Sequence, residues 1–247
     1  MSQPIATRNG PQHAPRHGFI QGIITAFPLL LGFVPVAFML GAEAAQKDFN
    51  SVLIMFLTMV NFAGGSEFAA IELWTSPPAV LFIIFVTLLV NSRHIIMGAT
   101  LAPHIKHLPK RKVFTILFFM ADEVWALSLR DITTQQQSNP AKKGFRFDFY
   151  MGVALSLYIT WTVCAGLGAY YGNMLGDLHQ YGLHMAFPAM FIVILVSMWN
   201  GKHNALPWAV SAAVAMLAYH YLPGGWYVIL GAMSGMFVVY LQGDKDA

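Results

Sequence analysis

Long apolar stretches, each followed by a short polar one, succeed one another along almost the whole chain. Most of them are close to the about 20 residues that a helix needs to cross the hydrocarbon core of a bilayer. The apolar segments, named one to eight in chain order, cover residues 19–42, 51–74, 79–103, 113–130, 149–171, 183–199, 205–221 and 225–242. This pattern predicts an all-α, polytopic integral membrane helical bundle with about seven to eight hydrophobic segments.

The composition agrees with a chain that lies in a membrane. Of the 247 residues, 57% are hydrophobic and 10% are charged. The charged share is less than half of the about 25% found in an ordinary soluble domain. So few charges could not cover the surface of a water-soluble fold, and they exclude a nucleic-acid binder with a basic face. We therefore expect a lipid bilayer around the chain and no nucleic-acid partner.

The sequence has no pattern that is typical of a metal or cofactor site. The one cysteine, Cys164, excludes an intrachain disulfide and a cysteine-based zinc site. The nine histidines form no HExxH motif, and the chain contains no GxxxxGKS/T phosphate-binding loop. We expect no metal, no cofactor and no direct use of ATP by this chain.

The two ends of the chain are polar. Residues 1–18 are rich in proline and arginine and predict a polar cytoplasmic tail. Residues 19–242 predict a single membrane transporter domain, and residues 243–247 a short polar C-terminus. A cleavable signal peptide is the alternative for the beginning, because Ala42-Glu43-Ala44 resembles a cleavage site. The apolar run before it is longer than the 7–15 residues of a signal peptide core, so we expect it to stay as the first helix.

Basic residues flank segment four on both sides, and they conflict with a simple crossing. Cytoplasmic loops are enriched in Lys and Arg. The basic residues are Lys106, Lys110, Arg111 and Lys112 before the segment, and Arg130, Lys142, Lys143 and Arg146 at its end. If segments two and four are re-entrant, both loops lie in the cytoplasm; irregular backbone is tolerated at membrane depth where protein surrounds it. Eight full spans with a weak charge bias, or seven spans, are the alternatives.

Several ionisable residues stand at membrane depth in segments two to four. They are Glu67, Glu72, Arg93, His94, Asp122 and Glu123. A charge at the bilayer centre costs at least about 2.5–3.5 kcal/mol, so such residues usually pair, face the bundle interior or line a path. We interpret all but Glu72, which is close enough to its segment end to reach water, as substrate-binding or coupling residues. Because Asp122 and Glu123 point roughly 100° apart on a helix, only one of them needs to face the same site. The alternative is a structural ion pair between Arg93 and Asp122 without a role in transport.

Two adjacent glycines, Gly64 and Gly65, interrupt segment two just before Ser66 and Glu67. A helix broken at this point exposes backbone N–H groups, which attract a carboxylate. In that case Gly64, Gly65 and Ser66 belong to the substrate site. The alternative is that the glycines only allow two helices to pack tightly.

Several motifs, taken in order and at their spacing, resemble the AzlC family, the large subunit of bacterial branched-chain amino acid exporters. The resemblance runs from about Gly22 to Gly243, and its motifs are GFVPVAFMLGAEA, FAGGSEF, SRHIIMGATLAP, MADEVWALSL and the stretch from Trp161 to Phe191. It implies a secondary exporter of Leu, Ile, Val and Met in the bacterial inner membrane. It also implies a small AzlD-type membrane subunit as a partner. Relatives usually carry Gln where this chain has Glu67, which adds a titratable group.

The resemblance and the charges together lead to a hypothesis for the mechanism. Arg93, helped by backbone N–H groups near Gly64 to Ser66, would hold the carboxylate of an amino acid. Asp122 or Glu67 would hold its ammonium group, and Phe, Met and Leu side chains would surround its apolar part. Coupling to an inward proton would run through Glu67, Asp122 or His94.

Two other classes of function stay open at this stage. A channel or a structural subunit would use the buried acids only for gating or folding. An intramembrane serine protease would use Ser66 as nucleophile and His220 as base, but Glu67 stands where such a motif needs glycine. Saturable transport and counterflow separate a carrier from a channel, and labelling of Ser66 by a serine-reactive probe would indicate the protease.

Overall fold

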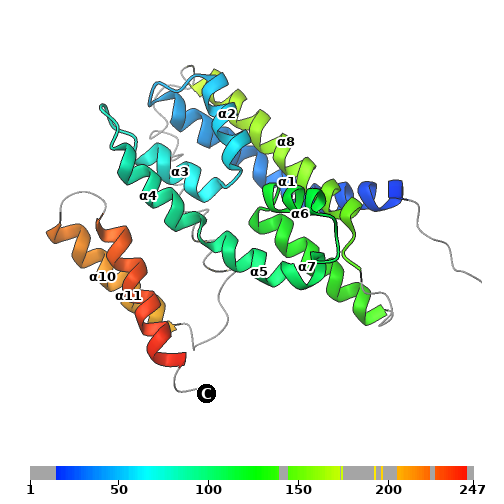
Figure 1. The fold of residues 1–247 in the computed structure, drawn as a ribbon. Helices are drawn as coiled ribbons and strands as arrows, with labels where there is room; N and C mark the ends of the chain where they lie inside the picture. The colour runs from blue at the N-terminus through cyan, green and yellow to red at the C-terminus, as the bar shows by residue number, and fades with distance from the viewer. Residues whose placement is uncertain are drawn as a thin grey trace, which may run out of the picture. The chain divides into compact units, whose positions relative to one another are not determined.

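The structure is a computed structural model, and it describes residues 15–138, 144–172, 174, 192, 196, 205–222 and 226–243. All regular secondary structure in these residues is helical, which confirms the all-α prediction for the described part of the chain (Figure 1). The helices are α1 (Pro15–Ala45), α2 (Ser51–Asn61), α3 (Gly64–Glu72), α4 (Val80–Asn91), α5 (Arg93–Ile105), α6 (Lys110–Phe118), α7 (Asp122–Ser138), α8 (Phe147–Gly172), α10 (Ala205–Tyr221) and α11 (Trp226–Gly243). Of segment six, only positions 192 and 196 are described.

Three stretches of the described chain are long and apolar enough to cross a membrane. They are Gly18–Ala45, Val80–Ile105 and Phe147–Gly172, and shorter apolar helices cover Ser51–Asn61 and Ile229–Gln242. The first helix begins at Pro15, earlier than the predicted position 19, and continues through Pro28 and Pro35. Proline is well tolerated in the first turn of a helix, where its missing N–H would have no helical partner.

The chain divides into two compact units. Met1–Gly64 and Ser92–Gly176 form the first, and Gly65–Asn91 and Asp177–Ala247 form the second. The positions of the two units relative to one another are not determined, so each is described by itself. In the second unit, α10 packs on α11, and Gly231 allows close contact with Ala215. The prediction of a single transporter domain stays a prediction.

The first unit is built on the close contact between α1 and α8 (Figure 1). A Cβ atom at Gly22 would lie only 3.1 Å from the Cα atom of Gly152, and one at Gly41 only 2.7 Å from the backbone nitrogen of Ala169. Small residues of this kind let helix backbones approach closely in membranes. The early residues of α1 meet the early residues of α8, and the late residues meet the late ones. The two helices therefore run parallel.

Segments two and four are broken in the middle, which the re-entrant scheme for these two segments allows, and segment three contains a one-residue turn that the sequence did not predict. Segment two breaks after Asn61, where Phe62 takes a left-handed conformation with φ of 42°. Segment three is interrupted only by a one-residue turn at Ser92, whose backbone keeps helical angles, and segment four breaks between Phe118 and Asp122. Asn, Ser and Asp favour helix ends because their side chains compete for backbone hydrogen bonds, and Asp is stabilised at a helix N-terminus. Asp122 therefore begins a helix and does not stand in the centre of one.

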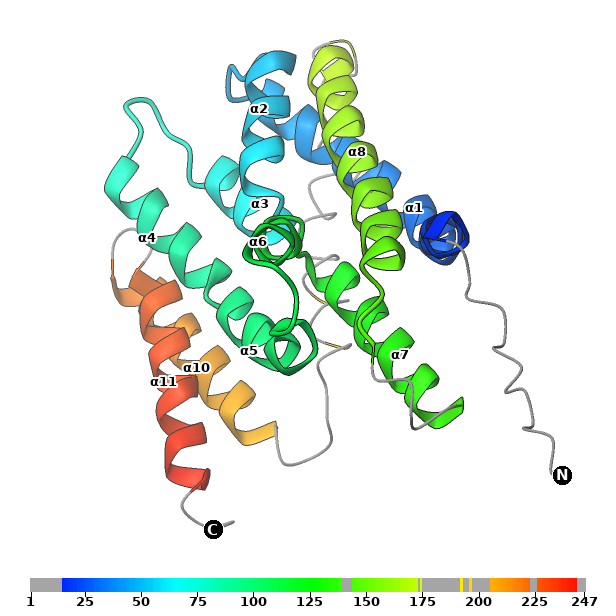
Figure 2. The same ribbon diagram turned by 45° about the vertical axis from the view of Figure 1, so that its right-hand side comes forward.

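Segment four starts and ends at the same end of α8 (Figure 2). In α6, the Lys112 Nζ atom lies 4.9 Å from the centre of the Phe147 ring, and the Ile116 carbonyl accepts a hydrogen bond of 2.7 Å from the Tyr150 hydroxyl. Farther along, the ring centres of Phe119 and Tyr158 are 5.0 Å apart. In α7, Asp131 forms an ion pair with Arg146, the residue before α8.

Segment two approaches the same part of α8 from the opposite end. Near the C-terminal end of α8, Met55 of α2 lies against Gly166. At the other end of α2, the Tyr158 hydroxyl donates to the Met59 carbonyl at 2.8 Å, and the ring centres of Phe62 and Tyr158 are 5.0 Å apart. The breaks of segments two and four therefore lie at the level of Tyr158. This level is about 17 Å along α8 from Phe147, roughly half the thickness of a bilayer core.

Candidate functional site

An ion pair joins the first residues of two helices in the first unit. The Nη1 atom of Arg93, at the start of α5, lies 3.0 Å from the Oδ2 atom of Asp122, at the start of α7. The two side chains are 24% and 30% exposed, so the pair is neither dry nor freely solvated. The contact that the sequence suggested between these residues is therefore present. Whether it serves transport or only holds the fold together is a separate question.

A second contact fixes α5 beside α7. The Trp125 Nε1–H group donates to the Thr100 hydroxyl at 2.9 Å, and this hydroxyl donates to the Met97 carbonyl at 2.8 Å. Thr100 lies two turns after Arg93, and Trp125 lies one turn after Asp122. Both helices therefore lead away from the ion pair in the same direction, with their N-termini together.

The ion pair lies at the level of the middle of α8. Asp122 follows Phe119 by three residues, and Phe119 contacts Tyr158 half-way along α8. Arg93 also stands midway in the candidate span Val80–Ile105. Two independent features of the chain thus place the pair near the centre of a bilayer that α8 crosses. A charge at this depth is expensive and is usually functional.

The electrostatics of this place favour an anion. The first N–H groups of a helix have no helical partner, and a helix N-terminus carries a partial positive charge. Here the N-terminus of α7 adjoins Arg93, which follows the turn at Ser92 and adds a full positive charge. The buried Nε atom of Arg93 makes no hydrogen bond to any described residue. Asp122 neutralises the guanidinium but leaves this donor unused, so a carboxylate could still bind there.

Three other predicted residues, Glu123, His94 and Gly64, belong to the first unit. Glu123 and His94 are the second residues of α7 and α5, and both are half-buried. Gly64 begins α3, and a Cβ atom there would lie 2.9 Å from the Trp161 ring, one turn beyond Tyr158. The glycine thus stands next to a helix break and also permits a close approach to Trp161, and its part in a substrate site stays a prediction.

The remaining predicted residues belong to the second unit. Gly65, Ser66 and Glu67 lie in the first turn of α3, and Ser66 and Glu67 are completely buried. Glu72, the last residue of α3, is exposed, as expected for a side chain that reaches water. The distances from these residues to Arg93 and Asp122 are not determined, so their part in the same site stays a prediction.

Sequence reasoning missed Tyr158 and the residues that orient the ion pair. Tyr158 is one of several Tyr, Ser and Thr residues on a long apolar helix, and nothing in the sequence distinguishes it from a residue of ordinary packing. Thr162, four residues farther along α8, is buried, and the Thr162 hydroxyl has no hydrogen-bond partner among the described residues. Trp125 and Thr100 had no signal of their own. Within the described residues, no group of three His, Cys, Asp or Glu side chains could hold a metal ion.

Broken helices whose charged ends meet at half-depth are typical of membrane transporters. The family model described as AzlC protein matches residues 28–175, which is more than half of the chain and includes the ion pair. The chain therefore belongs to the AzlC family of membrane transporters, which is not an enzyme family. No solved structure matches the chain.

Three curated relatives agree with this assignment. An uncharacterized membrane protein of Archaeoglobus fulgidus is 30% identical over 83% of this chain and 85% of its own length. The inner membrane protein YgaZ of Escherichia coli is 23% identical over 96% of this chain and 97% of its own. The branched-chain amino acid transport protein AzlC of Bacillus subtilis is 26% identical over 86% and 80%. The chain is thus a multi-pass protein of the inner membrane.

Proposed function

We propose that this chain exports neutral, apolar amino acids such as Leu, Ile, Val and Met from the cytoplasm. The observation that carries the proposal is the Arg93–Asp122 ion pair at the adjoining N-termini of α5 and α7, half-way along α8. The name of the Bacillus subtilis relative supports the substrate class. The direction of transport rests on the resemblance to the exporters.

An amino acid would bind by exchanging partners with the ion pair. Its carboxylate would take the place of Asp122 at Arg93, where the unused Nε–H group can also donate. Its ammonium group would take the place of Arg93 at Asp122. Each charge of the site and each charge of the substrate would then have an opposite charge beside it.

This exchange selects substrates by their net charge. The empty pair is neutral as a whole, and it stays neutral when a zwitterion is bound. A substrate with an additional charge would leave one charge without a partner at membrane depth, which costs at least about 2.5–3.5 kcal/mol. One methylene group changes the preference for an apolar side chain by about 10–200-fold, so overlap among Leu, Ile, Val and Met follows.

The partner and the coupling ion also belong to this proposal. A small AzlD-type membrane subunit would complete the carrier, as the family resemblance implies. An inward proton would be carried by Glu67, His94 or Asp122, and Glu67 stands where relatives usually have Gln. A Glu67→Gln variant tests this role: uncoupled export that no longer depends on the proton gradient supports it, and unchanged coupling contradicts it.

Efflux after dipeptide loading tests the proposal. Cells express the chain with and without its small subunit, and released amino acids are quantified for the wild type, Arg93→Ala and the control Arg111→Ala. Arg111 is exposed at the start of α6. We expect saturable release of the apolar amino acids and counterflow, lost only in Arg93→Ala. Normal export by Arg93→Ala, or release without saturation or counterflow, would contradict the carrier mechanism.

A further inference from the structure

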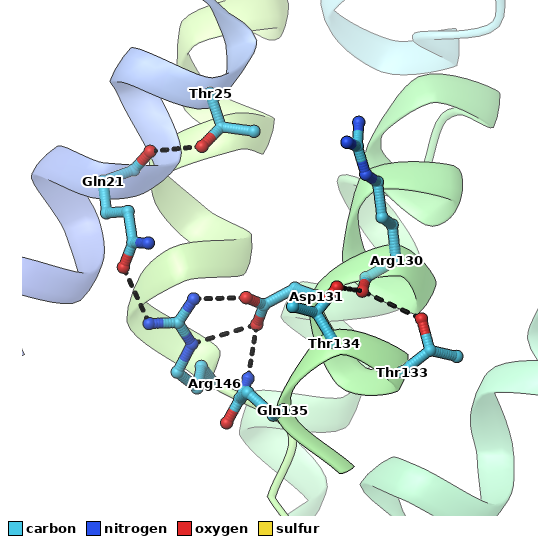
Figure 3. Close-up of polar contacts among 8 residues, drawn as sticks. All are labelled: Gln21, Thr25, Arg130, Asp131, Thr133, Thr134, Gln135 and Arg146. Atoms are coloured by element: carbon cyan, nitrogen blue, oxygen red, sulfur yellow. Dashed lines mark hydrogen bonds and ion pairs between the residues drawn. The ribbon is translucent and has the colours of Figure 1, made fainter. Parts of the chain in front are cut away.

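A second charged cluster lies where α8 begins, and it includes Asp131 from the middle of α7 (Figure 3). Arg146 donates from Nε to the Asp131 Oδ2 atom at 2.9 Å and from Nη2 to Asp131 Oδ1. Its Nη1 atom donates to the Gln21 Oε1 atom of α1 at 2.8 Å. Gln135 donates to Asp131 Oδ2 at 2.6 Å. We name these four residues, Gln21, Asp131, Gln135 and Arg146, the mouth latch.

The mouth latch is built to hold helices together. Arg146 and Asp131 pair through two parallel hydrogen bonds, which is the strongest geometry for these two groups. The Asp131 side chain is only 14% exposed, and the guanidinium lies 4.8 Å from the centre of the Phe149 ring. Such shielding makes the pair stronger than an ordinary surface ion pair. It ties α7 to α1 and to the start of α8.

The mouth latch lies at the cytoplasmic end of the first unit. Gln21 is near the start of α1 and Arg146 is just before α8, and these two helices run parallel. Lys112, in the first turn of α6, reaches Phe147 at the same end. Lys112 and Arg146, which come from the two sides of segment four, therefore share one end of the first unit, and the enrichment of cytoplasmic loops in Lys and Arg assigns that end to the cytoplasm.

The parallel direction of α1 and α8 restricts the path between them. If both cross the membrane in the same direction, an odd number of crossings lies between them. Segment four returns to the end of α8 where it started, and Val80–Ile105 is long enough for one crossing. Segment two must then return to its own side as well, so that segment three is the one crossing between α1 and α8.

We propose that segment four is a re-entrant hairpin inserted from the cytoplasm and that the mouth latch is the cytoplasmic gate below the Arg93–Asp122 site. The proposal rests on the proposed transport function. Helix α7 carries Asp131 at the mouth and Asp122 at the site, about 14 Å apart on one helix. A movement of α7 away from α1 therefore opens the mouth and disturbs the ion pair in one step. The structure, with the latch made, is the state that is closed to the cytoplasm.

Thiol labelling tests the hairpin first. Cys164 is replaced by Ser, and a single cysteine is placed at Arg111 or at Gln136, which are exposed on the two arms of the hairpin. A membrane-impermeant maleimide is added to intact spheroplasts or to inverted vesicles. We expect both positions to react only in inverted vesicles. Labelling of the two positions from opposite sides would overturn the hairpin.

The gate is tested with a buried reporter. Ser128 is buried on α7 one turn deeper than Asp131, so a cysteine there reports opening of the mouth. Asp131→Asn and Arg146→Gln should each raise its labelling rate in inverted vesicles at least about fivefold, the lower range of coupling between sites. Arg146→Lys keeps the charge but cannot form two parallel hydrogen bonds, so its labelling rate should lie between those of these variants and the wild type.

A matched control and a rescue separate gating from unfolding. Asp148→Asn removes an exposed carboxylate at the same end of α8 and outside the latch, so it should leave the labelling of Ser128→Cys unchanged. The exchanged pair Asp131→Arg with Arg146→Asp should restore protection, which a generally unfolded protein would not. Unchanged labelling in Asp131→Asn and Arg146→Gln would overturn the gate.

Because labelling needs no substrate, the experiments test the gate hypothesis and the transport hypothesis independently. A wild type that exports no amino acid contradicts the proposed function whatever the labelling shows. A wild type that exports amino acids while its latch variants label like the wild type contradicts the gate alone.

Discussion

Helix α7 carries two ion pairs with arginine, and they are built differently. At its start, Asp122 meets Arg93 through one contact of 3.0 Å, and the Arg93 Nε atom has no partner among the described residues. In its middle, Asp131 meets Arg146 through two parallel hydrogen bonds, and Gln135 and Gln21 satisfy further atoms of the pair. The first pair leaves capacity for another ligand, and the second uses nearly all of it. The difference indicates that one pair is suited to exchange partners and the other to hold helices together.

Exchanging the two charged residues within each pair should give the largest difference in export between the two pairs. In Arg93→Asp with Asp122→Arg, the ion pair can form again, but the substrate would have to bind in the reverse orientation, with its side chain in the wrong place. Efflux should fall by roughly 100-fold, which corresponds to about 3 kcal/mol for a charge-assisted contact. In Asp131→Arg with Arg146→Asp, export should stay within about threefold of the wild type. Both are measured as initial efflux rates at equal amounts of protein in the membrane.

Recovery of export in the exchanged Arg93–Asp122 pair would show that this pair is a structural clamp. Loss of the protein from the membrane in the same variant would lead to the same conclusion. A stable protein without export is the outcome that the substrate site requires.

The net charge of the substrate should give the next largest effect. Leucine and lysine have similar length, but lysine carries an additional positive charge, which the neutral Arg93–Asp122 pair cannot compensate. Lysine export should be at least about 20-fold slower, since even 2 kcal/mol corresponds to nearly 30-fold. Release of both amino acids is measured after loading with Leu- and Lys-containing dipeptides. Equal efflux of lysine and leucine would contradict a site that exchanges partners with a zwitterion.

Opening the mouth latch should change export less than removing the site. In Asp131→Asn the gate favours its open state, so the carrier spends less time in the conformation that releases substrate outward. Export should fall by about three- to tenfold in maximum rate, with little change in the substrate concentration at half-maximum rate. The control Asp148→Asn should transport like the wild type. A fall of 100-fold in Asp131→Asn would place Asp131 in the substrate site and remove the contrast between the two pairs.

The sequence predicted the apolar segments well and their interruptions poorly. The ranges 19–42 and 149–171 correspond closely to α1 and α8, because length and hydropathy alone decide whether a helix can span a membrane. The turn at Ser92 and the break before Asp122 depend on a few residues whose average hydropathy differs little from that of a span. The glycines of segment two and the basic residues around segment four gave warnings, and the break in segment two begins at Phe62, just before its glycines.

The charges at membrane depth were the best guide to the site. Their high cost led to two hypotheses, a substrate site and a structural ion pair between Arg93 and Asp122, and the structure contains the ion pair. The mouth latch gave no such signal, because Asp131 and Arg146 look like ordinary residues of a polar loop region in the sequence. Its members come together only because segment four turns back at Phe119, and that turn cannot be read from hydropathy. In the sequence, this turn was indicated by the basic residues that flank segment four on both sides.

Tyr158 should give the smallest effect, because it touches both helix breaks but neither ion pair. Tyr158→Phe removes the hydrogen bond to the Met59 carbonyl and keeps the ring contacts with Phe62 and Phe119. A hydrogen bond of this kind contributes about 1 kcal/mol, so the midpoint of thermal unfolding in detergent should fall by a few degrees. Tyr158→Ala should cost several times more, since it also removes the aromatic contacts. If Tyr158→Phe alone abolished export while the protein stayed folded, the hydroxyl would belong to the substrate path, and the separation between the two charged regions of α7 would have to include this third group.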